Sequence, residues 1–271
     1  MVLFLLGALI PSLSAFTVPS AHGQVVQIRY FTQTFLSCSS HNTVPDGSHN
    51  IPVNFSIPCQ VTTYWSTTEN STGKFLPLQP SPKPWPSGGV VLTSSGAGTF
   101  SRNPCPLNAN ALPNPNASAA TCITFYTPSR GSEGQHIISA CYPGDSIWPA
   151  SCALSVALTV TARTTSTSVV CGNPVKAHTM TLCTSTTSDA TTISTGGGIA
   201  IGGTDALSTN AGFPGTFGPV TCTPGSSSSG TTLTCSATYT PAHSGTEIIY
   251  DAYSGEYDHK TSTGQFTLTV T

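Results

Sequence analysis

Two stretches of the chain repeat one another and decide the fold: CITFYTPSRGSEGQHIISACYPGD (122–145) and CSATYTPAHSGTEIIYDAYSGE (235–256). In each, a cysteine stands four residues before a tyrosine, Thr-Pro follows at once, and the stretch closes on Tyr-x-Gly and an acidic residue. An alternating run follows each of them, ALSVALTVT (153–161) and GQFTLTVT (264–271). The chain therefore contains two copies of one structural unit.

The alternation in these runs is typical of β-strands. Residues at every second position lie on one face of a strand, so the apolar residues face a core and the others face outward. The apolar residues of the two runs are Leu154, Val156, Leu158, Val160, Phe266, Leu268 and Val270. Helical periodicity is absent after residue 16, and Gly, Pro, Asn and Ser separate the short runs. The sequence predicts an all-β protein of two tandem β-sandwich modules, residues 25–161 and 162–271, the first with an inserted loop at 66–88.

Charged residues are scarce in this chain. They make up 7% of 271 residues, and the formal net charge is −2. Eight Lys and Arg residues spread along the chain form no basic stripe, which argues against nucleic acid as a partner. Hydrophobic residues, at 38%, suffice for a modest core in each module, so we expect the exposed faces to carry hydroxyl groups instead of charges.

Ten cysteines indicate an oxidising compartment. Their spacing contains no Cys-x-x-Cys of the kind that binds zinc, and the sequence predicts neither a metal site nor another cofactor. Three Asn-x-Ser/Thr sequons, at Asn54, Asn70 and Asn116, lie in polar or Pro-rich stretches that can accommodate a glycan. These features together predict an extracellular or cell-surface protein.

The first residues, MVLFLLGALIPSLSAF (1–16), are apolar and uncharged. Pro11 interrupts this run after ten residues, which is too short for a membrane-spanning helix. Small residues at 12–15 are similar to a signal-peptide cleavage site, although no Lys or Arg precedes the run. Residues 1–24 are interpreted as a signal peptide. The alternative is a retained apolar assembly segment, the one part of the chain expected to meet a membrane.

The combined pattern resembles the bacterial and archaeal immunoglobulin-like repeats of prokaryotic surface proteins. It consists of a cysteine pair, a second pair whose last member precedes Tyr-Thr-Pro, a Tyr-x-Gly-acid turn and a closing Leu-Thr-Val-Thr strand, and it covers nearly all of residues 25–271. The segment GVVLTSSGAGTFS (89–101) is similar to the central strand pair of such a repeat. The resemblance implies two tandem, disulfide-containing immunoglobulin-like modules that serve as stalks, adhesin spacers or filament subunits.

The internal repeat also suggests which cysteines pair. The first two cysteines of one module match the first two of the other, the next two match likewise, and two remain within module one. The suggested pairs are Cys38–Cys59, Cys105–Cys122, Cys141–Cys152, Cys171–Cys183 and Cys222–Cys235. Each bond would close a short loop and contribute about 3 kcal/mol by the chain-entropy model.

No catalytic constellation can be assembled from the sequence. Gly144-Asp145-Ser146-Ile147 is similar to the nucleophile block of a lipase-like hydrolase family, but the Asp-x-x-His that would supply the base is missing. The glycine-rich segment 196–203 lacks the Lys-Ser/Thr of a phosphate-binding loop and is interpreted as a loop between strands. We expect no enzyme activity.

Two groups of residues have a weaker claim to ligands. Glu256, Asp258 and His259, with Asp251, could bind a hard cation such as calcium, although solvated turn residues are the commoner interpretation. Trp65, Trp85 and Trp148 are candidate contacts for a glycan or a protein, Trp85 foremost because prolines surround it.

These observations predict a structural subunit of an extracellular filament, pilus or surface layer that self-associates through its N-terminal segment. The strand-like VVQIRYF (25–31) could complete the sheet of a neighbouring copy. The assembly residues are Val25, Val26, Ile28, Tyr30 and Phe31. The alternative is a monomeric surface adhesin that binds glycans or a partner protein through the 66–88 loop.

Overall fold

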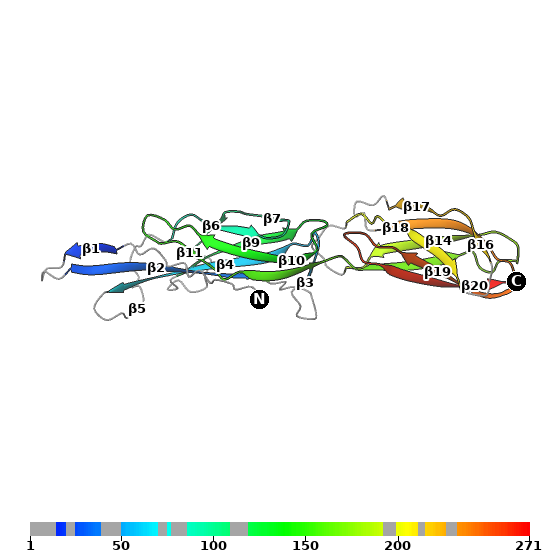
Figure 1. Ribbon diagram of the computed structural model, residues 1–271, viewed down its shortest axis with the longest axis horizontal. Coiled ribbons are helices and arrows are strands. Elements are labelled where there is room, and N and C mark those ends of the chain that lie inside the picture. The colour runs from blue at the N-terminus through cyan, green and yellow to red at the C-terminus, as the bar shows by residue number, and fades with distance from the viewer. Residues whose placement is uncertain are drawn as a thin grey trace, which may run out of the picture. The chain divides into compact units, whose positions relative to one another are not determined.

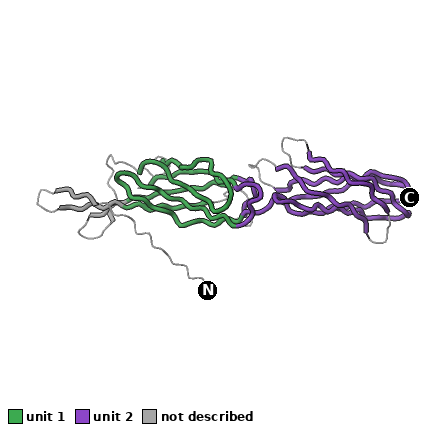
Figure 2. The backbone as a smooth tube through the Cα atoms, turned by 45° about the horizontal axis from the view of Figure 1, so that its top comes forward, with its two compact units in different colours: residues 1–49, 56–127, 135–159 green, residues 50–55, 128–134, 160–271 purple. Residues whose placement is uncertain are grey.

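The structure is a computed structural model that describes residues 15–19, 25–38, 50–69, 75–76, 86–108, 119–191, 199–210, 215–225 and 232–271. Every regular element among these residues is a β-strand, which confirms the all-β prediction (Figure 1). The chain divides into two compact units (Figure 2). Unit 1 comprises residues 1–49, 56–127 and 135–159, and unit 2 comprises residues 50–55, 128–134 and 160–271.

Two sheets account for the strands that precede residue 162. The first has the order β1 (Ala15–Pro19), β2 (Val25–Cys38), β4 (Ile57–Glu69), β9 (Ala119–Pro128), β7 (Gly98–Phe100), with β5 (Phe75–Leu76) paired to β4. The second has the order β3 (Asn50–Pro52), β12 (Val156–Thr161), β10 (Gly134–Tyr142), β6 (Gly89–Ser94), β8 (Cys105–Pro106), with β11 (Ser151–Cys152) paired to β10.

Two further sheets form the body of unit 2. One has the order β13 (Thr165–Cys171), β14 (Thr181–Asp189), β18 (Thr232–Thr240), β16 (Thr216–Phe217), with β17 (Thr221–Pro224) also paired to β18. The other has the order β15 (Asp205–Thr209), β19 (Gly245–Tyr253), β20 (Ser262–Val270).

Alternating strands place one face of each sheet in a core. Unit 1 buries Val61, Leu92, Trp65, Tyr142 and Trp148 in one cluster, among other residues. The main cluster of unit 2 includes Val169, Tyr239, Ile249, Leu268 and Val270. The alternation of the closing strands is confirmed for Leu158, Val160, Leu268 and Val270, which are buried. It is wrong for Leu154, which precedes β12 and is 93% exposed.

The segment 89–101 does not form a strand pair. β6 lies in one sheet and β7 in the other, so the chain crosses between the sheets at residues 95–97. Gly96 stands at this crossing, and a Cβ there would come within 2.1 Å of the His136 imidazole.

Candidate functional site

The predicted assembly residues lie in the first half of β2. Its backbone pairs with β1 from Val25↔Pro19 to Arg29↔Ala15, and with the end of β4 from Ile28↔Glu69 onward. The pairing of β4 with β9 ends at Tyr64↔Ala119. Beyond this point β4 has only the two-residue β5 on its other side among the described residues. The first half of β2 is therefore joined to unit 1 by a narrow ribbon of paired backbone.

The ten cysteines form the five pairs that the internal repeat suggests, and no cysteine is free. Four of the bonds join residues that lie directly opposite one another on adjacent antiparallel strands, with Cα–Cα distances of 4.0 to 4.1 Å. The paired residues are Cys38↔Cys59, Cys141↔Cys152, Cys171↔Cys183 and Cys222↔Cys235.

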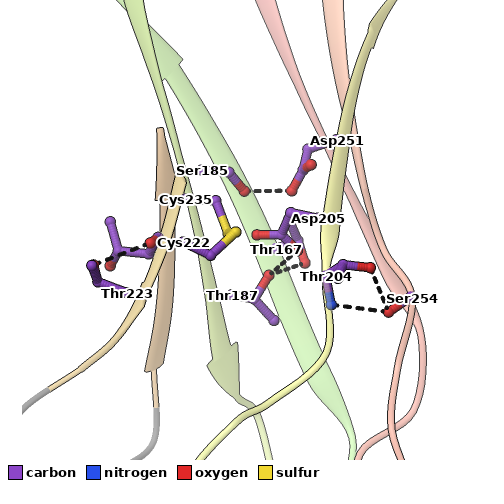
Figure 3. The surroundings of a disulfide bond; sticks show 11 residues. Thr167, Ser185, Thr187, Thr204, Asp205, Cys222, Thr223, Cys235, Asp251 and Ser254 are labelled. Atoms are coloured by element: carbon purple, nitrogen blue, oxygen red, sulfur yellow. Dashed lines mark hydrogen bonds between the residues drawn. A yellow bond between two sulfur atoms is a disulfide. The ribbon is translucent and has the colours of Figure 1, made fainter. Parts of the chain in front are cut away.

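Each of these four bonds fastens an outer strand to its inner neighbour. The end of β2, β11, β13 and β17 each have a strand partner on one side only in the part of the chain that the structure describes. Figure 3 shows the bond between β17 and β18, formed by Cys222 and Cys235. An outer strand is where a sheet opens or accepts a foreign strand, so the bonds hold closed the positions at which these sheets are weakest.

The fifth bond has a different geometry. Cys105 of β8 and Cys122 of β9 belong to different sheets, and their Cα atoms are 5.9 Å apart. The repeat equates this bond with Cys222–Cys235, which joins two strands of one sheet. The two bonds therefore correspond in sequence but not in structure, because β8 pairs with β6 whereas β17 pairs with β18.

The repeated Tyr-x-Gly-acid motif is a clamp on a loop. In unit 1, Gly144 adopts a φ of 83°, and the Asp145 carboxylate that follows it accepts the backbone N–H of Ile147 and of Trp148, each at 2.8 Å. Its other oxygen accepts the Ser87 N–H at 2.8 Å and the Ser87 hydroxyl at 3.0 Å. Asp145 thereby fastens the end of the inserted loop, immediately before β6.

Glu256 has the same role in unit 2. Gly255 adopts a φ of 73°, and the Glu256 carboxylate accepts the Gly202 N–H at 2.9 Å. Gly202 lies at the end of the glycine-rich segment, immediately before β15. The described part of that segment is thus a loop between strands, and the N–H of Gly202 donates to the Glu256 carboxylate of the same chain.

The hydrogen bonds of Asp145 also explain its ionisation. Burial acts to raise the pKa of Asp145, but the N–H groups of Ser87, Trp148 and Ile147 lower it to about 2. A carboxylate with these contacts is fixed in its charged form and in one orientation. Asp145 therefore positions a turn.

The acidic residues proposed as a cation site are separated by the fold. His259 Nδ1 lies 2.8 Å from Glu256 Oε1, whereas Asp258 is paired with Arg130 and accepts the Gly131 N–H at 2.9 Å. Asp251 points into the interior of unit 2 from β19. Among the described residues no three His, Cys, Asp or Glu side chains are grouped so as to hold a metal ion.

The interpretation as solvated turn residues is also wrong for Asp251, Asp258 and His259. Asp258 is 3% exposed, His259 is 1% exposed and Asp251 is fully buried. Asp258 and His259 belong to a buried network in which Arg163 Nε lies 2.5 Å from Asp189 Oδ2, both side chains being 3% exposed. His259 Nε2 lies 3.8 Å from the same oxygen. Burial acts to lower the pKa of His259, but the opposite effect of Asp189 and Glu256 is larger, so the pKa is raised.

The tryptophan prediction is wrong for two of its three residues. Trp65 and Trp148 are 5% and 2% exposed, and their rings pack against one another in the core with centroids 6.1 Å apart. Neither ring is available to a ligand. Trp85 lies outside the described residues, as do the sequons at Asn70 and Asn116. Asn54 is described and half-buried, with a φ of 58°.

In unit 1, three exposed aromatic residues and one exposed isoleucine lie together on the outer face of β2, β4 and β9. Phe35, Tyr64, Ile123 and Phe125 are each between 47% and 55% exposed. The rings of Phe35 and Tyr64 meet edge to face with centroids 5.4 Å apart. These four residues are called the aromatic face below. Sequence reasoning missed this face. Alternation along a strand shows which residues share a face, but it does not show whether that face is the inner or the outer one.

The described part of the chain contains no helix of the length and apolarity that crossing a membrane requires.

No family model matches the sequence, and no curated protein matches it. Solved structures match the chain at low identity and low TM-score. One is FdeC, described as an Escherichia coli adhesin, with 13% identity and a TM-score of 0.32 over 88% of this chain. The alignment spans 64% of that protein. Another is domains 4 and 5 of the S-layer protein SbsC, with 13% identity and a TM-score of 0.25 over 75% of this chain and 85% of that one. A longer SbsC fragment has 12% identity and a TM-score of 0.29 over 97% of this chain and 39% of that one.

Proposed function

We propose that this protein is a structural subunit of an extracellular filament, pilus or surface layer, built from two immunoglobulin-like modules and assembled through its N-terminal segment. The observation that carries the proposal is the position of the first half of β2. Residues 25–32 extend beyond the last β4–β9 pair, where their backbone partners are β1 and the terminal residues of β4.

Exchange of this segment between copies would cost few hydrogen bonds. β1 is only five residues long, so a neighbouring copy that offers a strand of equal length replaces the same backbone pairs. Strand addition of this kind needs a regular, extended donor. Val25–Phe31 is continuous strand, and its sequence alternates apolar and polar residues from Val26 to Arg29.

The disulfide arrangement fits a subunit that must persist outside the cell. Four bonds fasten outer strands in both units against edge opening, and the fifth joins the two sheets of unit 1. A bond that closes a loop of 11 to 21 residues restricts the unfolded chain and contributes about 3 kcal/mol.

The test is electron microscopy of the native, non-reduced protein, with its mature N-terminus determined by mass spectrometry. We expect regular assemblies from the wild type and none from Ile28→Pro, because proline cannot donate to a strand pair. The matched control, Ile28→Val, keeps a β-branched residue and should assemble normally. Assemblies formed by the Ile28→Pro variant, or by a chain that lacks residues 1–31, would refute assembly through this segment.

The aromatic face supports a second candidate function, adhesion to glycans. Exposed aromatic rings offer the flat apolar surface on which sugar rings stack, and Gln33 and Gln60 beside them can hydrogen-bond to hydroxyls. A glycan array then distinguishes the candidates. Binding by a monomer that is lost in Phe35→Ser/Tyr64→Ser, but kept in the control Val170→Ser on the exposed side of β13, would favour the adhesin.

A further inference from the structure

Unit 2 buries two aspartates side by side. Asp205 of β15 is 6% exposed and Asp251 of β19 is fully buried. In the register of these strands Asp205 pairs with Tyr253 and Leu207 pairs with Asp251, so the two aspartates are diagonal neighbours on the inner face of one sheet.

Two hydroxyl groups face this pair from the opposite sheet. Ser185 and Thr187 lie at alternate positions of β14, and their side chains donate to Asp251 and Asp205 respectively (Figure 3). The distance from Thr187 Oγ1 to Asp205 Oδ1 is 3.5 Å, which is long for a hydrogen bond. Each hydroxyl reaches one oxygen of one carboxyl group.

The other oxygen of each carboxyl group has no partner. Asp205 Oδ2 and Asp251 Oδ1 are buried without a hydrogen bond, and so is the hydroxyl of Tyr253 beside them. A buried carboxylate is stable only if it is hydrogen-bonded, paired with a cation or protonated. Two adjacent carboxylates in such a site also repel one another.

No positive side chain is available to this pair among the described residues. Arg163 is paired with Asp189 and Arg130 with Asp258, while Lys176 and Lys260 are exposed. The neighbouring groups are neutral: Thr167 of β13 bonds to Thr187, Cys235 of β18 is in a disulfide, and Ser262 of β20 bonds to Thr167.

The remaining titratable neighbours are acidic or phenolic. Tyr253 lies on β19, with a pKa raised to about 12 by burial and by Glu256 and Asp205. Glu247, earlier on the inner face of β19, donates nothing to the pair and accepts the Tyr239 hydroxyl at 2.6 Å. The surroundings therefore supply no charge that would stabilise two ionised aspartates.

Unit 1 shows that the fold does not require acids here. Leu92 pairs with Ala140 as Leu207 pairs with Asp251, so Ala140 is the counterpart of Asp251. By the same register Val90 is the counterpart of Asp205, two residues before the leucine. Val61 stands two residues after Cys59, as Ser185 does after Cys183. Val61, Val90 and Ala140 are all fully buried and pack in one apolar cluster.

We propose that Asp205 and Asp251 form a proton-binding site in the interior of unit 2, where a carboxyl group keeps its proton under conditions in which an exposed aspartate has lost it. The bound proton removes the repulsion and turns an unpartnered oxygen into a donor toward the neighbouring carboxylate. Unit 2 is then more stable in mild acid than at neutral pH.

The direction of the pH effect follows from linkage. Burial, and then the charge of Asp251, raise the pKa of Asp205 to about 6, and burial raises that of Asp251. A raised folded-state pKa contributes stability that is complete below the ordinary aspartate value and is lost as the pH rises through the folded value. We therefore expect the folding equilibrium constant of unit 2 to fall about ten-fold between about pH 5 and pH 7.5 from Asp205 alone.

The experiment is denaturant unfolding of the full, non-reduced chain at both pH values. A short hydrogen-exchange pulse at one fixed pH, read by mass spectrometry on peptides of β14 and β19, follows unit 2. Tryptophan fluorescence follows unit 1, because all three tryptophans precede residue 149. We expect the β14 and β19 midpoints to fall at the higher pH.

The matched variant is Asp205→Val/Asp251→Ala/Ser185→Val, which copies the residues of unit 1. It should lose the ten-fold pH dependence that the wild type shows in this range. If the triple variant does not fold, Asp205→Asn is the variant to measure, and it should lose most of the same pH dependence. An equal pH dependence in these variants and the wild type would overturn the proposal. Stabilisation of wild-type unit 2 by millimolar calcium chloride over EDTA at the higher pH would also overturn it, since the pair would then hold a cation.

Discussion

The guanidinium of Arg163 lies 2.5 Å from the carboxylate of Asp189, and both side chains are 3% exposed. Arg163 stands where the sequence passes from one repeat to the next, and Asp189 ends β14. His259 and the backbone N–H of Thr191 also lie near Asp189, and although burial acts to raise its pKa, these groups and Arg163 bring it well below its ordinary range.

Replacement of Arg163 by methionine should destabilise unit 2 by about 3 to 5 kcal/mol, because it leaves the Asp189 charge buried without its partner. Removal of both partners in Arg163→Met/Asp189→Leu should cost much less, since no buried charge remains. Denaturant unfolding with hydrogen exchange on β14 peptides measures both values. Equal losses in the single and double variants would contradict a buried ion pair.

The charge of His259 should stabilise unit 2 below neutral pH. Its pKa is raised by Asp189 and Glu256 against the effect of burial, so the contribution is complete below the ordinary histidine value and is lost as the pH rises through the folded value. His259→Gln should therefore reduce the change in unit 2 stability between about pH 6 and pH 9. NMR titration of the His259 ring in the wild type checks the same shift directly.

Asp145→Asn should destabilise unit 1 at neutral pH by about 1 to 2 kcal/mol, because the amide keeps the shape but loses the charge that five donors bind, the Tyr142 hydroxyl among them. The pKa of Asp145 is depressed to about 2, so its contribution is present above the ordinary aspartate value and disappears as the pH falls toward 2. Tryptophan fluorescence during urea unfolding reports on unit 1. A variant as stable as the wild type at pH 7 would show that the clamp on Ser87 is dispensable.

The disulfides should differ in how their loss is expressed. Cys171→Ser/Cys183→Ser removes an outer-strand bond, so we expect faster hydrogen exchange confined to β13 and a loss of about 3 kcal/mol. Cys105→Ser/Cys122→Ser removes the bond between two sheets and should raise exchange throughout unit 1. Uniform exchange after the loss of Cys171–Cys183 would contradict the assignment of that bond to an outer strand.

The secondary structure class and the internal repeat could both be predicted from the amino-acid sequence alone. Alternating apolar positions are a local property, so the strand at 262–270 and its counterpart at 156–161 could be predicted from a few residues. The suggested cysteine pairs agree with the structure. Each pair consists of cysteines that are close to one another along the chain, separated by 11 to 21 residues, and four of the five pairs have a counterpart in the other repeat. Local sequence also marks Gly144 and Gly255, where a positive φ is needed for the turn before the acidic residue.

Which face of a strand is buried was decided only by the tertiary structure. Trp65 and Phe35 are both aromatic residues of long strands, yet one is 5% exposed and the other 49%. The two faces of a strand carry the same period, so the choice depends on which side the second sheet covers. The separation of β6 and β7 into different sheets was likewise not visible in the sequence, which resembles a strand pair over residues 89–101.

The placement of the acids was likewise beyond the sequence. In EIIYDAY the acids and apolar residues Glu247, Ile249, Asp251 and Tyr253 share one face, and this alternation was the available signal. Asp and Glu are mostly exposed in proteins, so the alternation alone did not predict that these acids are buried. Asp205 comes from a separate strand, and its approach to Asp251 exists only once β15 pairs with β19. The sequence determined which residues could form strands, and the packing of the sheets decided which of their charges had to be kept from water.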